Sequence, residues 1–70
     1  MNHKKKFQEL EGVIVAKYGT RGLFAKELDM TLTTLGRKLN GKSPWKQKEI
    51  ELSCKLLEIP KKDIQHYFFN

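Results

Sequence analysis

An apolar row through the middle of the chain constrains its fold most strongly. Five large side chains recur at the spacing of one helix face: Phe24, Leu28, Leu32, Leu35 and Leu39. A single helix over 21–40 would carry them all, but it would hold three threonines and a glycine in its interior, where both residue types are unfavourable. A strand fits worse, because the apolar alternation that begins at Met30 fails at Thr34.

A break in this row is the better prediction. Asp29 tolerates a left-handed backbone conformation better than most residues, and Thr31 is a good N-cap for a new helix. We therefore expect a helix over 21–28, a tight turn at Asp29 and Met30, and a second helix over about 32–40. In the single-helix alternative, Leu32 would be a core residue.

Amphipathic spacing predicts three more helices, over about 5–18, 46–58 and 61–68. Gly19 should end the first of them, and Pro60 should break the one before the last. The predicted fold is all-α: one domain over 1–70, built as a compact bundle of about five short helices. At this length only roughly 60% of the unfolded surface is buried, which leaves little room for a catalytic pocket.

Residue types that perform catalysis or bind metals are sparse. His3 and His66 lie at opposite ends of the chain, and neither has a partner at metal-ligand spacing. The single cysteine, Cys54, has apolar helical neighbours, so we expect a core residue rather than a nucleophile. Trp45, just before an amphipathic segment, is expected to anchor the core. The chain is thus expected to be no enzyme and to need no metal and no cofactor.

Charge is concentrated around the apolar row. The formal net charge is +6 at pH 7; residues 19–48 contribute +5, residues 1–18 contribute +2 and residues 49–70 contribute −1. A focused basic region attracts a polyanion, most often nucleic acid, although a solubilising surface gives the same composition. No apolar run suits a signal peptide or a membrane span, so we expect no membrane partner and a cytoplasmic location.

The segment TRGLFAKELDMTLTTLGRKLNGK, residues 20–42, resembles the helix-turn-helix of the phage Cro and repressor family. The matching features are the alanine at 25, the leucine before the turn, the threonine-rich start of the second helix and the closing Asn-Gly-Lys. The runs KLNGKSPWKQKEIE and HYFF are similar to small Cro-like or repression-modulator proteins of temperate phages of Gram-positive bacteria. This resemblance implies a lambda-repressor-like DNA-binding domain in a bacterial host cytoplasm.

The resemblance also implies roles for individual residues. The positions that match base-contacting residues are Thr31, Leu32, Thr33 and Arg37. The positions that match or adjoin phosphate-contacting residues are Thr20, Arg21, Thr34, Lys38, Asn40 and Lys42. Two positions depart from the family pattern: Asp29 stands where glycine is usual, and Leu32 stands where polar residues are commoner.

Two functions are therefore expected to compete. The first is a sequence-specific repressor of a phage lysis–lysogeny switch that binds double-stranded operator DNA, with the C-terminal aromatic segment a candidate dimer contact. The second is an antirepressor or co-repressor that binds a phage repressor protein through Met30 and Leu32. An antitoxin is a third option, but it usually needs an additional toxin-binding segment.

Overall fold

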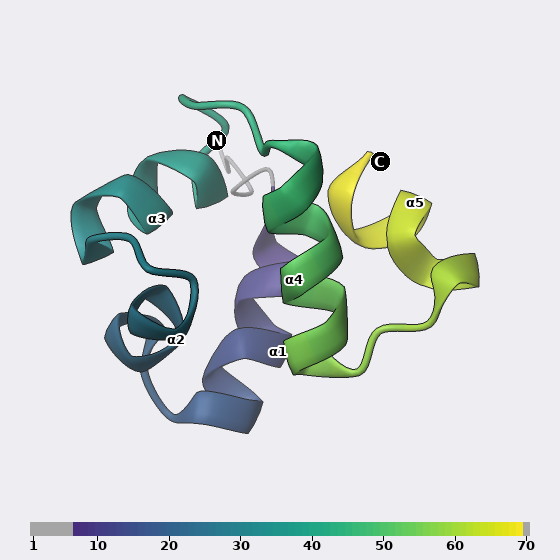
Figure 1. The fold of residues 1–70 in the computed structure, drawn as a ribbon, viewed down its shortest axis with the longest axis horizontal. Helices are drawn as coiled ribbons and strands as arrows, with labels where there is room; N and C mark the ends of the chain where they lie inside the picture. The colour runs from purple at the N-terminus through teal and green to yellow at the C-terminus, as the bar shows by residue number, and fades with distance from the viewer. Residues whose placement is uncertain (1–6, 70) are drawn as a thin grey trace, which may run out of the picture.

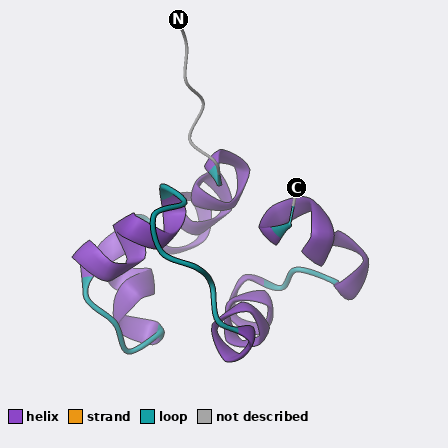
Figure 2. Ribbon diagram, turned by 90° about the horizontal axis from the view of Figure 1, so that it is seen from above, coloured by secondary structure: helices purple, strands orange, loops and turns teal. Residues whose placement is uncertain are grey.

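A computed structural model describes residues 7–69 of the chain. Its elements are α1 (Gln8–Tyr18), α2 (Arg21–Glu27), α3 (Leu32–Leu39), α4 (Gln47–Leu57), the 3₁₀ turn η1 (Lys61–Asp63) and α5 (Ile64–Phe68). Helix α1 packs against every other α-helix, with α2 and α3 on one side of the α1–α4 pair and α5 on the other (Figure 1). Within the described range all regular structure is helical (Figure 2). The predicted all-α bundle of five short helices is confirmed.

Glycine ends the first helix as expected. Gly19 has φ 87°, and its N–H donates to the carbonyl of Val15 at 2.8 Å. A residue with a side chain would be strained in this left-handed conformation. The predicted start of this helix at residue 5 lies outside the described residues.

The break between α2 and α3 forms where the sequence places it. Asp29 has φ 59°, in the left-handed region, so the single-helix alternative is wrong. The N–H of Met30 donates to the carbonyl of Ala25 at 3.0 Å and folds the turn back onto α2. Thr31 then caps α3, because its Oγ1 accepts a hydrogen bond from the N–H of Thr34 at 3.1 Å. Thr20 caps α2 in the same way, accepting from Leu23 at 3.2 Å.

The later helices are shorter than predicted. Helix α4 begins at Gln47, because the N–H of Lys46 donates to the Glu49 carboxylate at 2.9 Å and so marks Lys46 as the cap. The helix ends before Glu58, which is left-handed with φ 58°. Pro60 follows, and the last predicted helix divides into η1 and α5.

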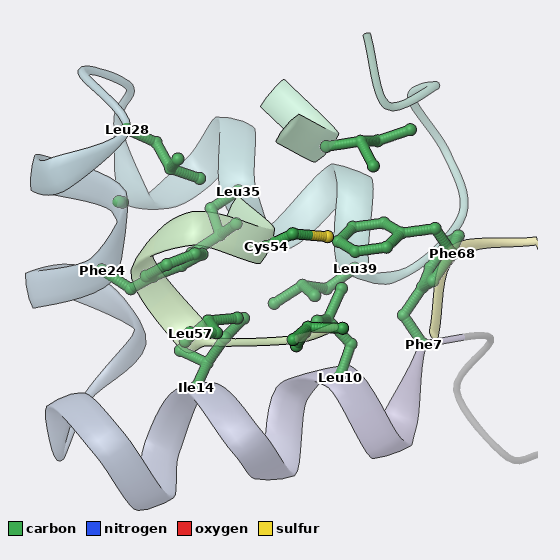
Figure 3. Packing of buried hydrophobic residues seen from close by; sticks show 13 residues of the cluster. Phe7, Leu10, Ile14, Phe24, Leu28, Leu35, Leu39, Cys54, Leu57 and Phe68 are labelled. Atoms are coloured by element: carbon green, nitrogen blue, oxygen red, sulfur yellow. The ribbon is translucent and has the colours of Figure 1, made fainter. Parts of the chain in front are cut away.

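Side chains from α1, α2 and α3 meet in one core, closed by α4 and α5 (Figure 3). The large apolar side chains with less than 2% exposure are Leu10, Ile14, Phe24, Leu35 and Leu39. Cys54 is buried against this core, as predicted. Trp45 is also confirmed as an anchor, since its ring makes edge contacts with Phe7 and with Phe68 at centroid distances of 6.1 and 5.2 Å. The core thus holds α3 firmly by one side only.

Candidate nucleic-acid interface

Helix α3 has one buried and one exposed face. Leu35, Lys38 and Leu39 are buried, and rotation of about 100° per residue places them on one side of the helix. Thr33 and Arg37 project from the opposite side and are exposed, followed by the exposed Asn40 just after the helix. Gly36 is half-buried beside Thr33 at the edge of this face, and a methyl group at its Cβ position would meet nothing within 4 Å. The outer face is therefore polar, with a gap in the side-chain layer at Gly36.

An exposed leucine stands at the margin of this face. Leu32 opens α3 and is 49% exposed, whereas its neighbour Met30 is half-buried and packs against the core. Leu23, in the first turn of α2, is also 53% exposed. Beside the turn, Lys26, Asp29, Met30 and Thr31 line a shallow hollow of about 290 Å³.

The threonines that start α3 already make local contacts. The Thr31 hydroxyl accepts from the N–H of Thr34 and donates to the Thr34 hydroxyl at 3.0 Å. Since a hydroxyl has one donor and two acceptor positions, Thr31 keeps one acceptor position and its methyl group for a partner. Thr33 is exposed on the outer face, while Thr34 is half-buried at its edge.

The start of α2 carries the next two predicted residues. Thr20 is exposed and directs its hydroxyl oxygen to the α2 backbone. The Arg21 guanidinium lies 3.4 Å from the Glu11 carboxylate of α1, with the Arg21 side chain 39% exposed. A phosphate bound here would share Arg21 with Glu11.

The loop after α3 is folded back on the end of that helix. The N–H groups of Lys42 and Ser43 donate to the carbonyl of Arg37 at 2.8 and 3.3 Å. Gly41 makes this return possible with φ 78°. The side chain of Lys42 is exposed, and the backbone N–H of the same residue is hydrogen-bonded to the backbone of Arg37. The structure thus joins the backbones of these two residues of the predicted set.

The assignment of Lys38 as a phosphate contact does not fit the structure. Its side chain is 6% exposed, and its Nζ lies 2.9 Å from Glu49 Oε1 and 2.9 Å from the carbonyl oxygen of Pro44. An ammonium held by a carboxylate and a carbonyl inside the fold is not available to DNA. Lys38 lies three residues after Leu35 and directly before Leu39, and this position on the buried side was the available signal.

Glu49 is the residue that the sequence interpretation missed. Its Oε1 accepts from Lys46 N–H and from Lys38 Nζ. Partial burial alone would raise the pKa of this carboxyl, but the hydrogen bond from Lys46 and the hydrogen bond and charge of Lys38 bring it below its ordinary value. The capping-box spacing of Lys46 and Glu49, three residues apart, was its only signal.

A family model described as "Protein of unknown function (DUF739)" matches residues 4–70. The chain belongs to this family. The match spans every described helix of the DUF739 chain and every residue of its candidate interface. A search of curated proteins found no match.

Among residues 7–69, no three His, Cys, Asp or Glu side chains are grouped so that they could hold a metal ion. No helix of the described part of this DUF739 chain is long and apolar enough to cross a membrane. Burial raises the pKa of the Cys54 thiol, which disfavours the nucleophilic thiolate.

Proposed function

We propose that this protein is a sequence-specific DNA-binding regulator of transcription, in which α2, the turn and α3 act as a helix-turn-helix. The supporting observation is the outer face of α3, where Thr33, Arg37 and Asn40 are exposed while Leu35 and Leu39 anchor the opposite face. A helix held in this way can enter the major groove without losing its core contacts.

Base contacts are assigned to the first part of α3 and to Arg37. The guanidinium of Arg37 donates two parallel hydrogen bonds to the O6 and N7 of guanine. Thr33 hydrogen-bonds a base edge, and Leu32 packs against a thymine methyl group. Thr31 contributes its methyl group and its remaining acceptor position. The gap at Gly36 allows the backbone of α3 to approach the groove floor.

Phosphate contacts are assigned to residues around this helix. Thr20 and Arg21 reach the backbone from the start of α2, with Arg21 partly neutralised by Glu11. Asn40 and Lys42 contact the DNA backbone after the end of α3, and Thr34 contacts it from its half-buried position. The cationic contacts, from Arg21 and Lys42, release bound counterions, so affinity falls as salt rises.

A dimer would give the specificity that one short recognition helix lacks, because two copies can read half-sites about 34 Å apart. The C-terminal aromatic segment is the candidate contact. Phe68 is buried and Tyr67 is half-buried. The residue of this segment that can contact a second copy is therefore Phe69, which is 62% exposed. Phe69 borders a hollow of about 410 Å³ lined also by Phe7 and Trp45.

The direct test is selection of binding sites from a randomised duplex library, followed by fluorescence anisotropy. We expect a recurring motif that binds at least a hundredfold more tightly than a shuffled duplex, with a log–log salt slope of about −2 per bound copy for the two cationic phosphate contacts, Arg21 and Lys42. Equal binding of the selected and the shuffled duplex would contradict sequence-specific recognition.

The second candidate function is an antirepressor or co-repressor that binds a phage repressor protein. The exposed Leu32 and Leu23 favour it, because apolar side chains at the edge of a polar helix face are typical of a protein contact. Met30 contributes through the hollow beside the turn. Co-purification with a co-expressed phage repressor protein tests this function, and Leu32→Ala should then weaken the complex. If the Leu32→Ala variant binds the repressor with unchanged affinity, the surface around Leu32 is not the binding site for that protein.

A further inference from the structure

The buried ammonium of Lys38 bridges three parts of the fold. The residue belongs to α3, the carbonyl that it contacts belongs to Pro44 in the loop, and the carboxylate belongs to Glu49 in the first turn of α4. Both contacts are 2.9 Å long. A lysine suits this position, because its ammonium is a compact point charge on a flexible stem.

Two groups of contacts hold the connecting loop, residues 40–46: backbone hydrogen bonds to Arg37 at its start, and the Lys38–Glu49 pair at Pro44 and Lys46. At its start, the N–H groups of Lys42 and Ser43 are held on the carbonyl of Arg37. At its end, Lys46 N–H is held on the same Glu49 carboxylate oxygen that contacts Lys38. Since the loop contains no regular secondary structure, these contacts decide where Lys42 stands relative to α3.

We propose that Lys38 is a positioning residue of the DNA interface: it holds the loop so that Lys42 stays beside Arg37. This inference rests on the proposed function. A buried ion pair contributes little net stability compared with an apolar replacement, because desolvation offsets the attraction. The benefit of the Lys38–Glu49 ion pair here is that it orders the loop. A phosphate contact from a loop that is already ordered avoids the entropy cost of fixing it on binding.

A double-mutant cycle on DNA affinity tests the proposal. Lys38→Met keeps a straight side chain of similar length and removes the ammonium. We expect Lys42→Ala and Lys38→Met each to raise the Kd about fivefold, and the double variant to bind no more than about twofold more weakly than either single variant. If Lys42→Ala costs the same fivefold in both backgrounds, Lys38 does not act through Lys42 and the proposal fails.

Two further variants separate positioning from overall charge. Lys55→Met removes the same charge from an exposed position on α4 and should change the Kd less than twofold. Glu49→Ala removes a negative charge, so overall electrostatics would tighten binding, whereas loss of the bridge should weaken it about threefold. Tighter binding by Glu49→Ala would overturn the proposal and would favour a freed Lys38 that contacts phosphate. If circular dichroism shows that Lys38→Met is unfolded, Glu49→Ala provides the test.

Amide hydrogen exchange in the free protein separates this inference from the proposed function. Without the bridge, the amides of Lys42 and Ser43 should exchange at least tenfold faster, while that of Leu10 in the core of α1 should not change. Unchanged exchange at Lys42 and Ser43 would overturn the inference even if DNA binding is found. The opposite result is also informative: faster exchange at these amides, in a protein that shows no sequence-specific DNA binding. It would reject the proposed function but would still show that Lys38 orders the loop.

Discussion

The Nζ atom of Lys38 lies 2.9 Å from Oε1 of Glu49, which joins the outer helix α3 to the first turn of α4. The remaining charge at this end of α3, on Arg37 and Lys42, is exposed. The basic segment of the chain therefore contains two kinds of cation. One kind is used inside the fold, and the other is available to a partner.

Stability should depend on pH through Glu49. Its pKa is below the ordinary value of 4.5 in the folded protein, so its contribution is fully present above about pH 4.5 and is lost as the pH falls through the folded pKa. Urea unfolding between pH 7 and pH 3 should show a larger loss of unfolding free energy for the native sequence than for Glu49→Gln. Parallel curves for the two proteins would show that this carboxylate does not stabilise the fold.

Gly36→Ala should separate stability from binding. Alanine removes the helix penalty of glycine, worth about 0.5–1 kcal/mol, and its methyl group meets nothing within 4 Å. The free protein should therefore gain stability in thermal unfolding, while its DNA affinity falls because the gap on the outer face is filled. Gly12→Ala, at an open position of α1, is the matched control: it should gain similar stability and bind DNA normally. Unchanged DNA affinity of Gly36→Ala would show that α3 does not approach its partner at this point.

Removal of a hydroxyl should have opposite effects at two positions. Ser53 is fully buried, and its Oγ has no hydrogen-bond partner within the described range, so Ser53→Ala should raise the unfolding free energy by about 1 kcal/mol. Thr31 caps α3, so Thr31→Ala should lower it by about 1 kcal/mol. Chemical denaturation measures both. A Ser53→Ala protein that is clearly less stable would mean that the hydroxyl has a partner.

Cys54 should react slowly with thiol reagents while the protein is folded. The residue is only 8% exposed, and burial raises the pKa of its thiol, so both access and the thiolate fraction are reduced. Labelling with an aromatic disulfide at pH 7 should accelerate at least a hundredfold when urea unfolds the chain. Rapid labelling of the folded protein would show that the core opens at α4.

The elements around the interface were predictable because their signals are local. The Thr20 and Thr31 caps, the left-handed Asp29 and the glycine at 19 each act within four residues of chain, and the structure shows all four. The start of α4 was less predictable because it depends on one side-chain contact, from Glu49 back to Lys46.

The role of Lys38 was hidden for a different reason. Its partners lie six and eleven residues away, in the loop and in another helix, and no local pattern records them. A lysine among other basic residues is typical of a solvated surface. Its place on the buried side of α3 was the one signal, and its contacts with Pro44 and Glu49 show that this lysine lies inside the fold.

The most direct measurement is the affinity of Arg37→Ala for the selected DNA site and for its shuffled counterpart, beside Lys62→Ala as an exposed lysine control on the 3₁₀ turn. Loss of the guanine contact should weaken binding to the selected site by about 1–3 kcal/mol and reduce its preference over shuffled DNA. Lys62→Ala should keep that preference. If Arg37→Ala binds the selected site and discriminates as well as the native protein does, α3 does not read DNA through this residue, and the proposed recognition helix is wrong.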